Sequence, residues 1–296
     1  MPLVATLVSR PADHALSLSL ANMASRSVGA SAVVWLAEGI ACDLALPSQA
    51  DAADATAALR ASLAGEPVDV IVQQAETRRK KILIADMDST MIDQECIDEL
   101  AEEVGLKEHV AAITARAMNG EIEFEPALRE RVALLEGLQL AVVDEVIRKR
   151  ITLSPGSREL VATMRARGFH TALVSGGFTV FTAPVARMLG FDENRANVLV
   201  TEGGRLTGKV VEPILGRQAK VDALAELAAR FAISTDDAIA VGDGANDLGM
   251  LGLAGSGVAI HAKPSVAAQA KIRIDHGDLT ALLYVQGYRK ADFVAG

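Results

Sequence analysis

Two aspartates stand two residues apart, directly after a short apolar run. Asp86 and Asp88 belong to the segment Asp86-Met-Asp-Ser-Thr90, which follows Ile82-Leu-Ile-Ala85. Aspartate is a poor strand residue, and like charges this close repel each other unless a cation lies between them. Magnesium is such a cation, because it prefers oxygen ligands and takes few of them from the protein. The segment therefore predicts a Mg2+ site at the end of a strand.

Two further turns carry groups that suit a phosphate and a metal. Ser175-Gly176-Gly177 follows the apolar run 171–174, and Gly242-Asp243-Gly-Ala-Asn246-Asp247 follows the run 238–241. Glycines let backbone N–H groups approach an anion closely, and a serine hydroxyl adds one more donor. The last turn adds carboxylates to the same metal pocket. Lys220 opens helical sequence before the third run, and together these groups predict one phosphate-binding site.

Three continuous apolar runs must position these turns. The runs 82–85, 171–174 and 238–241 lack alternation, which is typical of central parallel strands buried on both faces. Each is followed by a polar turn and helical sequence, the pattern of an α/β fold with a doubly wound parallel sheet. Ligands bind at the carboxyl ends of such strands. The stretch from about 93 to 152 has helical spacing and no strand pattern, so we expect an inserted helical cap over those ends.

In these motifs the sequence resembles the haloacid-dehalogenase superfamily of phosphohydrolases. The resemblance covers about residues 81–289 and implies a HAD-like, Rossmannoid sheet. It implies that Asp86 attacks phosphorus and forms an aspartyl-phosphate. Asp88 is implied as the acid that protonates the leaving group and as the base that then activates water. Lys220 is implied as the third catalytic residue, because its charge offsets that of the transferred phosphoryl group.

The same resemblance implies how the phosphate and the metal are held. Mg2+ would be bound by Asp86, the main-chain carbonyl of Asp88, and Asp243. Asp247 would be a supporting carboxylate that orients Lys220 or a water molecule on the metal. The residues expected to bind the phosphate are Ser175, Gly176, Gly177, Lys220 and Asn246.

The cap sequence narrows the resemblance to the phosphoserine phosphatase family. The likeness rests on residues 91–100, 118–120, 124 and 128–132, and continues through 196–197, 202–208, 218–220, 261–264 and 274–283. A phosphorylated amino acid needs a carboxylate for its ammonium group and a forked guanidinium for its carboxylate. By position these are Glu95 and Arg131, with Met118 and Phe124 as an apolar wall. The resemblance implies hydrolysis of O-phosphoserine, the last step of serine biosynthesis.

Two other functions stay open at this point. A HAD phosphotransferase, or a phosphatase for another small phosphomonoester, would carry the same motifs. A serine-sensing regulatory protein with an inactive phosphatase half is the alternative from another class, although its catalytic set would be intact. A closed helical cap should bar folded phosphoproteins from the site.

The first 76 residues predict a separate small domain. Apolar and helical segments alternate in the order of a ferredoxin-like βαββαβ, α+β fold. The order resembles a degenerate ACT-type domain, without the glycine-bearing first turn usual in that family. The charged run Glu76-Thr-Arg-Arg-Lys-Lys81 predicts a solvated linker, which sets expected domains at 1–76 and 77–296. A homodimer through the N-terminal domain is a further hypothesis.

Composition excludes several classes of partner. The formal net charge of −9 argues against a nucleic-acid surface and an anionic membrane surface. The two cysteines have neither disulfide-framework nor zinc-site spacing, which fits a reducing compartment. The first residues lack the pattern of a secretory signal, and no apolar stretch is long enough to span a bilayer. We therefore expect a cytoplasmic protein that acts on a small molecule.

Overall fold

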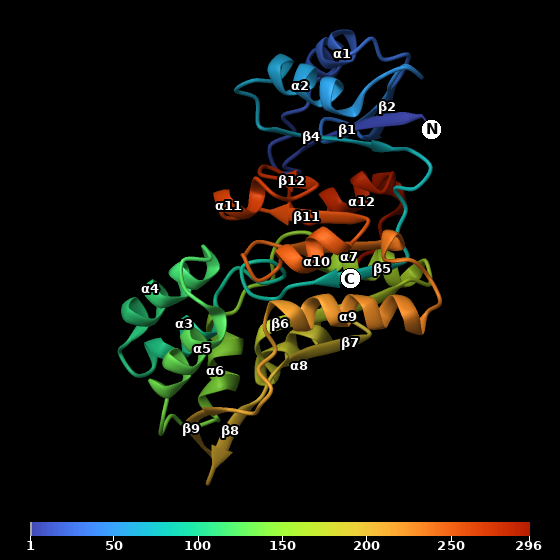
Figure 1. The fold of residues 1–296 in the computed structure, drawn as a ribbon. Coiled ribbons are helices and arrows are strands. Elements are labelled where there is room, and N and C mark those ends of the chain that lie inside the picture. The colour runs from blue at the N-terminus through green and yellow to red at the C-terminus, as the bar shows by residue number, and fades with distance from the viewer. Residues whose placement is uncertain (1) are drawn as a thin grey trace.

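The chain folds around two main sheets, one above the other in Figure 1. The computed structural model describes residues 2–296. The smaller sheet has the strand order β2-β3-β1-β4, and the larger has the order β12-β11-β10-β5-β6-β7. Among residues 2–296 we find no helix whose length and hydropathy would let it cross a membrane.

The smaller sheet is antiparallel and lies at the N-terminus. Its helices α1 and α2 pack on one side, where Leu7, Leu16 and Leu59 share a buried apolar cluster. Helix α1 begins at Leu18, because the Ser17 hydroxyl caps its first turn. The order of elements is the predicted βαββαβ, namely β1 (Leu3–Ser9), α1 (Leu18–Ser27), β2 (Val33–Ala37), β3 (Ala41–Ala45), α2 (Ala52–Ser62) and β4 (Val68–Gln74).

The larger sheet is parallel throughout, as predicted. Its strand β6 runs beyond the predicted end at Val174, so the Ser175-Gly176-Gly177 segment lies inside an irregular strand and not in a turn. The strands are β5 (Ile82–Ala85), β6 (His170–Phe178), β7 (Glu193–Asn197), β10 (Ala238–Gly242), β11 (Ser256–Ile260) and β12 (Ile272–Ile274).

Helices cover both faces of this sheet, and successive residues of β5 serve opposite faces. Ile82 and Ile84 belong to the apolar cluster under α9 and α10, while Leu83 packs in the cluster under α7, α8 and α12. Burial on both faces explains why the run lacks alternation. The helices are α7 (Ser157–Ala166), α8 (Thr179–Leu189), α9 (Arg217–Arg230), α10 (Leu248–Leu253), α11 (Pro264–Ala267) and α12 (Ala281–Val285).

Four helices gather beside one end of the larger sheet (Figure 1). They lie within the range predicted for the cap and are α3 (Cys96–Glu102), α4 (Lys107–Met118), α5 (Phe124–Ala133) and α6 (Val142–Arg150). A two-stranded antiparallel hairpin, β8 (Leu199–Glu202) and β9 (Arg205–Val210), packs against α5. The helices therefore stand where they can cover groups at that end of the sheet.

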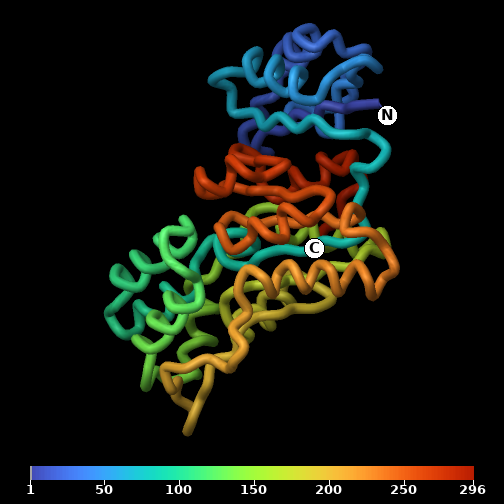
Figure 2. Tube along the Cα trace, in the orientation of Figure 1, coloured from blue at the N-terminus to red at the C-terminus, as the bar shows by residue number. Residues whose placement is uncertain are grey.

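The N-terminal sheet is docked on the C-terminal part of the chain, as Figure 2 shows. The carboxylate of Asp69 in β4 accepts backbone N–H bonds from Asp275 and Gly277, both at 2.8 Å. Gln73 donates to the carbonyl of Val285 at 2.7 Å. Buried hydrogen bonds to a charged group stabilise more than neutral ones do. The two sheets are thus held together by specific polar contacts.

The charged run between the sheets is solvated only in part, with Glu76, Thr77, Arg79 and Lys81 exposed. Lys80 is buried, and its ammonium group donates to the carbonyls of Thr77 and Asp236 at 2.8 and 2.7 Å. Arg78 forms an ion pair with Asp43 of the N-terminal sheet at 2.8 Å. The sequence did not reveal the contacts of Arg78 and Lys80, because Asp43 and Asp236 lie far along the chain. The domain limits, the ACT-type likeness and the homodimer stay predictions.

Candidate active site

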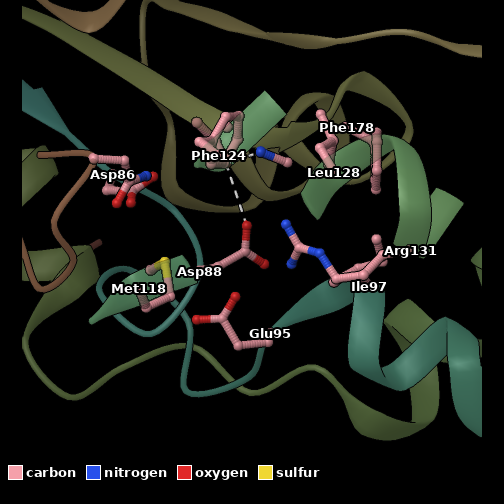
Figure 3. Close-up of a pocket in the computed structure, with 13 residues that line it drawn as sticks. Asp86, Asp88, Glu95, Ile97, Met118, Phe124, Leu128, Arg131 and Phe178 are labelled. Carbon is pink, nitrogen blue, oxygen red and sulfur yellow. Dashed lines mark hydrogen bonds between the residues drawn. The ribbon is translucent and has the colours of Figure 1, made fainter. Parts of the chain in front are cut away.

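Three adjacent strands bring together the residues that are predicted to bind the phosphate and the metal. Strand β5 lies between β10 and β6, so Asp86 after β5 stands between Asp243 after β10 and Ser175 in β6. A cavity of about 40 Å³ lies there, with cap helices on one side (Figure 3). The predicted residues that line it are Asp86, Asp88, Glu95, Met118, Phe124, Arg131, Ser175, Gly176, Gly177 and Asn246.

Lys220 lies behind the cavity between two carboxylates. Its ammonium nitrogen is 2.7 Å from Asp86 Oδ1 and 2.7 Å from Asp247 Oδ1, and all three side chains are buried. Burial alone would lower the pKa of Lys220, but Asp247 and Asp86 raise it above its ordinary value. The lysine therefore stays charged, and it fixes one oxygen of Asp86, which also accepts the N–H of Met87 at 2.8 Å.

Asp247 ties the third turn to this lysine. Its Oδ2 accepts the backbone N–H groups of Asp243 and Gly244 at 3.2 and 3.0 Å, while Oδ1 binds Lys220. One carboxylate thus fixes the backbone that presents Asp243 and the cation that contacts Asp86. The supporting role of Asp247 stays a prediction.

Gly242 leaves the space in which Asp247 lies. A Cβ at position 242 would stand 2.3 Å from Asp247 Cγ, so an alanine there would displace this buried carboxylate from its bonds to Lys220 and Gly244. We expect Gly242→Ala to lower kcat by on the order of 10²-fold, because displacing catalytic groups by about 1 Å has such an effect. Steady-state phosphate release would measure it. Gly252→Ala on α10, where a Cβ meets open space, is the matched control, and equal activity of the two variants would contradict the placement.

Three buried carboxylates form a cluster that fits a divalent cation. Asp86, Asp243 and Asp247 each offer one oxygen, and these oxygens lie within 4.8 Å of one another. Burial, together with the negative charges of Asp247 and Asp86, raises the pKa of Asp243 well above its ordinary value. Lys220 balances only part of this charge. Hard oxygen ligands with excess negative charge suit an ion such as Mg2+ or Ca2+.

Asp88 is held apart from that cluster. Its Oδ1 accepts the N–H of Cys96 at 2.8 Å and its Oδ2 accepts the hydroxyl of Ser175 at 3.2 Å. The cluster therefore contains Asp247 rather than the Asp88 carboxylate, and the predicted metal contact through the Asp88 carbonyl stays a prediction. Burial, and then the charge of Asp86, raises the pKa of Asp88 to about 6. Near neutral pH this group can both give and take a proton.

Glu95 faces the cavity from the start of the cap. Its Oε1 accepts the hydroxyl of Ser89 at 2.7 Å. Burial of the carboxyl group, with the charges of Asp88 and Asp243, raises the pKa of Glu95 well above its ordinary value. A cationic group of a ligand would favour the ionised form, so this position suits an ammonium group.

Arg131 on α5 points into the same cavity, and in Figure 3 its guanidinium is directed toward Asp88 and Glu95. Its Nε donates to the carbonyl of Ala127 and its Nη1 to the hydroxyl of Thr114, both at 3.0 Å. Among residues 2–296, no carboxylate forms an ion pair with it. Burial lowers its pKa despite the nearby Glu95 and Asp98. A buried guanidinium without a paired anion is costly, and a carboxylate from a ligand would remove that cost.

Phe124 closes the cavity on the cap side. A Cβ at Gly176 would stand 2.7 Å from its ring, and one at Gly216 would stand 3.3 Å from it. The ring therefore lies against two bare backbone segments of the larger domain. Met118 also lines the cavity, as predicted for an apolar wall.

Comparison with known proteins identifies the family. The sequence profile described as haloacid dehalogenase-like hydrolase matches residues 83–252. A phosphoserine phosphatase of Polaromonas sp. is 46% identical over 224 residues, which are 74% of this chain and 95% of that protein. The chain belongs to the phosphoserine phosphatase family of haloacid dehalogenase-like hydrolases. The predicted superfamily, fold class and enzyme class are thereby confirmed.

Solved structures of the family agree with this assignment. A probable phosphoserine phosphatase from Vibrio cholerae, in unliganded form, has a TM-score of 0.78 and 31% identity, covering 98% of this chain and 88% of that one. A phospho-aspartyl intermediate analogue of a phosphoserine phosphatase has a TM-score of 0.66 and 41% identity, covering 70% and 98%. The first likeness extends over the N-terminal sheet as well.

Sequence reasoning missed three apolar residues that line the cavity, Ile97, Leu128 and Phe178. Leu128 had a usable signal, because Phe124, Leu128 and Arg131 follow helical spacing on one face of α5. Asn246 lines the cavity as predicted, and its Oδ1 is buried without a hydrogen-bond partner among residues 2–296. A buried polar atom of this kind marks a place for a ligand.

Proposed function

We propose that this chain hydrolyses O-phosphoserine to serine and inorganic phosphate through an acyl-phosphate on Asp86. The observation that carries the proposal is a single small cavity with complementary walls. One wall holds the carboxylates Asp86 and Asp88 beside Lys220. The other holds Glu95 and the guanidinium of Arg131, which has no carboxylate partner among residues 2–296. A small molecule that carries a phosphate, an ammonium group and a carboxylate would complement the groups on these walls.

In the first step, a carboxylate oxygen of Asp86 attacks phosphorus while the bond from phosphorus to the serine oxygen breaks. Asp88 gives its proton to the departing oxygen, so serine leaves as the neutral alcohol. Lys220 offsets the charge on the phosphoryl oxygens, and Ser175 with the N–H groups of the following glycines positions them. The solved relative carrying a phospho-aspartyl intermediate analogue is consistent with this step.

In the second step, Asp88 acts in its ionised form. It takes a proton from a water molecule whose oxygen attacks phosphorus, and the bond to the Asp86 oxygen breaks. Phosphate leaves, Asp86 is a carboxylate again, and Asp88 carries the proton needed for the next cycle. Glu95 and Arg131 hold the ammonium and carboxylate groups of the substrate during the first step, which aligns its phosphate with Asp86.

Mg2+ is the metal that we propose for the acidic cluster. When bound, it supplies positive charge that offsets the phosphoryl oxygens and the carboxylates around them. Asp86, Asp243 and the main-chain carbonyl of Asp88 would hold it, with Asp247 keeping the third turn in place.

The raised pKa of Asp88 predicts a pH dependence that differs between substrates. Below about pH 6 most of this carboxyl is protonated, and each unit above reduces the protonated fraction about tenfold. Formation of the acyl-phosphate from O-phosphoserine should therefore slow as the pH rises through 7 and 8. With p-nitrophenyl phosphate it should not slow, because that leaving group needs no proton. Rapid-quench single turnovers at several pH values would test this, and parallel profiles would contradict the acid role of Asp88.

Phosphate release tests the whole proposal. O-Phospho-L-serine should be hydrolysed at a kcat/KM on the order of 10² times that of O-phosphothreonine, a sugar phosphate or p-nitrophenyl phosphate. A chelator should abolish turnover, and added Mg2+ should restore it.

The other outcomes discriminate between the alternatives. Turnover of only the other phosphates would retain Asp86 as nucleophile and discard phosphoserine as substrate. Faster consumption of phosphoserine when serine or homoserine is present, with transfer of its phosphate to them, would indicate a phosphotransferase. No turnover with any substrate would favour a regulatory protein.

A further inference from the structure

Two polar contacts inside the cap fix the direction of the Arg131 side chain. This arginine is only 5% exposed. A guanidinium carries five N–H donors, and here the Nε group donates to the carbonyl of Ala127 while Nη1 donates to the hydroxyl of Thr114, both at 3.0 Å. The other N–H groups have no hydrogen-bond partner among residues 2–296. They are enough for a forked contact with the carboxylate of a ligand.

Thr114 on α4 links this guanidinium to a carboxylate of the protein. Its side chain is buried, and its hydroxyl donates to Asp98 Oδ1 at 2.7 Å. The carbonyl of Val110 lies farther away, at 3.1 Å. A hydroxyl has a single proton, and a charged, nearer oxygen is the stronger acceptor. The proton of Thr114 therefore points to Asp98, and its lone pairs are left to accept from Arg131.

The Thr114 hydroxyl separates two opposite charges. Among residues 2–296, no direct ion pair joins Asp98 to Arg131. Opposite charges attract strongly where water is excluded. Without the hydroxyl, the guanidinium would turn toward Asp98 and away from the cavity. With it, Asp98 orients the hydroxyl, and the hydroxyl keeps the guanidinium available to a ligand.

This bridge joins three cap helices. Asp98 lies on α3, Thr114 on α4 and Arg131 on α5, and these helices lie together in Figure 1. Glu95 directly precedes α3, and its carbonyl accepts the N–H of Asp98 at 3.0 Å. The bridge therefore ties the arginine to the helix that presents Glu95.

We propose that Thr114 is a positioning residue that holds the guanidinium of Arg131 toward the carboxylate of the substrate, with Asp98 orienting its hydroxyl. Thr114 acts on recognition of the amino-acid part of the substrate and not on the phosphate, because Asp86 and Lys220 contact each other in the larger domain. The inference rests on the proposed function, since it takes a carboxylate as the group that Arg131 binds.

Two phosphonates measure the carboxylate contact without turnover of phosphoserine. L-2-Amino-4-phosphonobutyrate is O-phosphoserine with a methylene in place of the ester oxygen, and 3-aminopropylphosphonate is the same molecule without its carboxylate. Both serve as competitive inhibitors of p-nitrophenyl phosphate hydrolysis. The wild-type protein should bind the first at least about tenfold more tightly than the second.

Thr114→Val keeps the shape of the side chain and removes the hydroxyl. It should raise the Ki of the aminophosphonobutyrate at least about tenfold, the effect of losing one hydrogen bond to a charged group, and leave the Ki of the aminopropylphosphonate unchanged. Thr114→Ser, which keeps the hydroxyl, should stay within about threefold of wild type. Thr56→Val on α2 is the matched control, because that hydroxyl also bonds within a helix, to the carbonyl of Ala52 at 2.7 Å, and it should change neither constant.

Asp98→Ala tests the same bridge from a partly exposed position. Combined with Thr114→Val, it should cost about as much as Thr114→Val alone, because both changes remove one bridge and act as a unit. If Thr114→Val does not fold, Asp98→Ala must raise the ratio of the two Ki values, and an unchanged ratio would overturn the proposal.

Three results would contradict the role of Thr114. A rise of both Ki values by the same factor would mean that it only supports the packing of the cap. Unchanged Ki values would mean that Arg131 does not need it, and a wild-type protein that binds both phosphonates equally would mean that Arg131 does not bind the carboxylate. If the phosphonates are distinguished but phosphoserine is not hydrolysed, the proposed function fails while the Ki values still decide the role of Thr114.

Discussion

Asp86→Asn should lower kcat for O-phosphoserine by on the order of 10⁴-fold or more, because an amide cannot form the acyl-phosphate. Asparagine has nearly the same shape and keeps one oxygen that can accept from Lys220 and from the N–H of Met87. The fold should therefore survive, although the charge balance around Lys220 changes. Phosphate release and circular dichroism, measured on the same preparation, would separate the loss of chemistry from a loss of structure.

The control for this prediction is Asp222→Asn on the exposed side of α9. Asp222 is exposed and accepts a surface hydrogen bond from Gln218, so its amide variant should keep full activity. Acid-quenched protein provides a second readout, since wild-type enzyme should carry acid-stable phosphate during turnover and Asp86→Asn should carry none. If Asp86→Asn retains activity within about tenfold of wild type, Asp86 is not the nucleophile.

Arg131→Ala should reduce kcat/KM for O-phosphoserine by about 10² to 10³-fold, the loss expected when a charged, forked hydrogen-bond donor is removed. The activity on p-nitrophenyl phosphate should fall far less, because that substrate has no carboxylate. Arg131→Lys should lie between, since it keeps the charge but not the planar fork. Steady-state kinetics with both substrates would give the ratio directly.

Arg129 offers a matched control two residues away on the same helix. It is exposed and pairs with Glu125 and Glu212, so Arg129→Ala should leave both substrates unaffected. Surface pairs of this kind contribute little to stability, because solvent screens their charges. Equal losses of both activities in Arg131→Ala would instead indicate that this arginine only supports the packing of the cap.

The contrast between these two arginines shows where sequence reasoning reached its limit. Both lie in one helical stretch, and only the resemblance to a family selected Arg131. In the fold, Arg131 turns toward the cavity and Arg129 toward solvent, because α5 packs its Ala127 and Leu128 face inward. Packing between helices decides which arginine faces the cavity, and local sequence encodes that packing only as periodicity.

Interactions between the two domains could not be predicted from the sequence either. Lys80 looked like part of a solvated charged run, yet it is buried against carbonyls of Thr77 and Asp236. Residues 10–12 of the loop after β1 line one cavity together with residues 89–90 and 277–279, which lie far along the chain. Such contacts depend on the relative placement of whole elements, and no local pattern records them.

The sequence by itself determined the sheet and the chemistry at its edge. Buried parallel strands require continuous apolar runs, and the groups that directly follow such runs lie together at the carboxyl ends of the strands. Asp86, Ser175 and Asp243 each follow an apolar run directly, so their meeting could be predicted from the sequence. Tertiary structure decided which charges are paired. It placed Asp247 between Lys220 and the third turn, and it left Arg131 without a carboxylate partner among residues 2–296, because pairing depends on distances that only the packed chain sets.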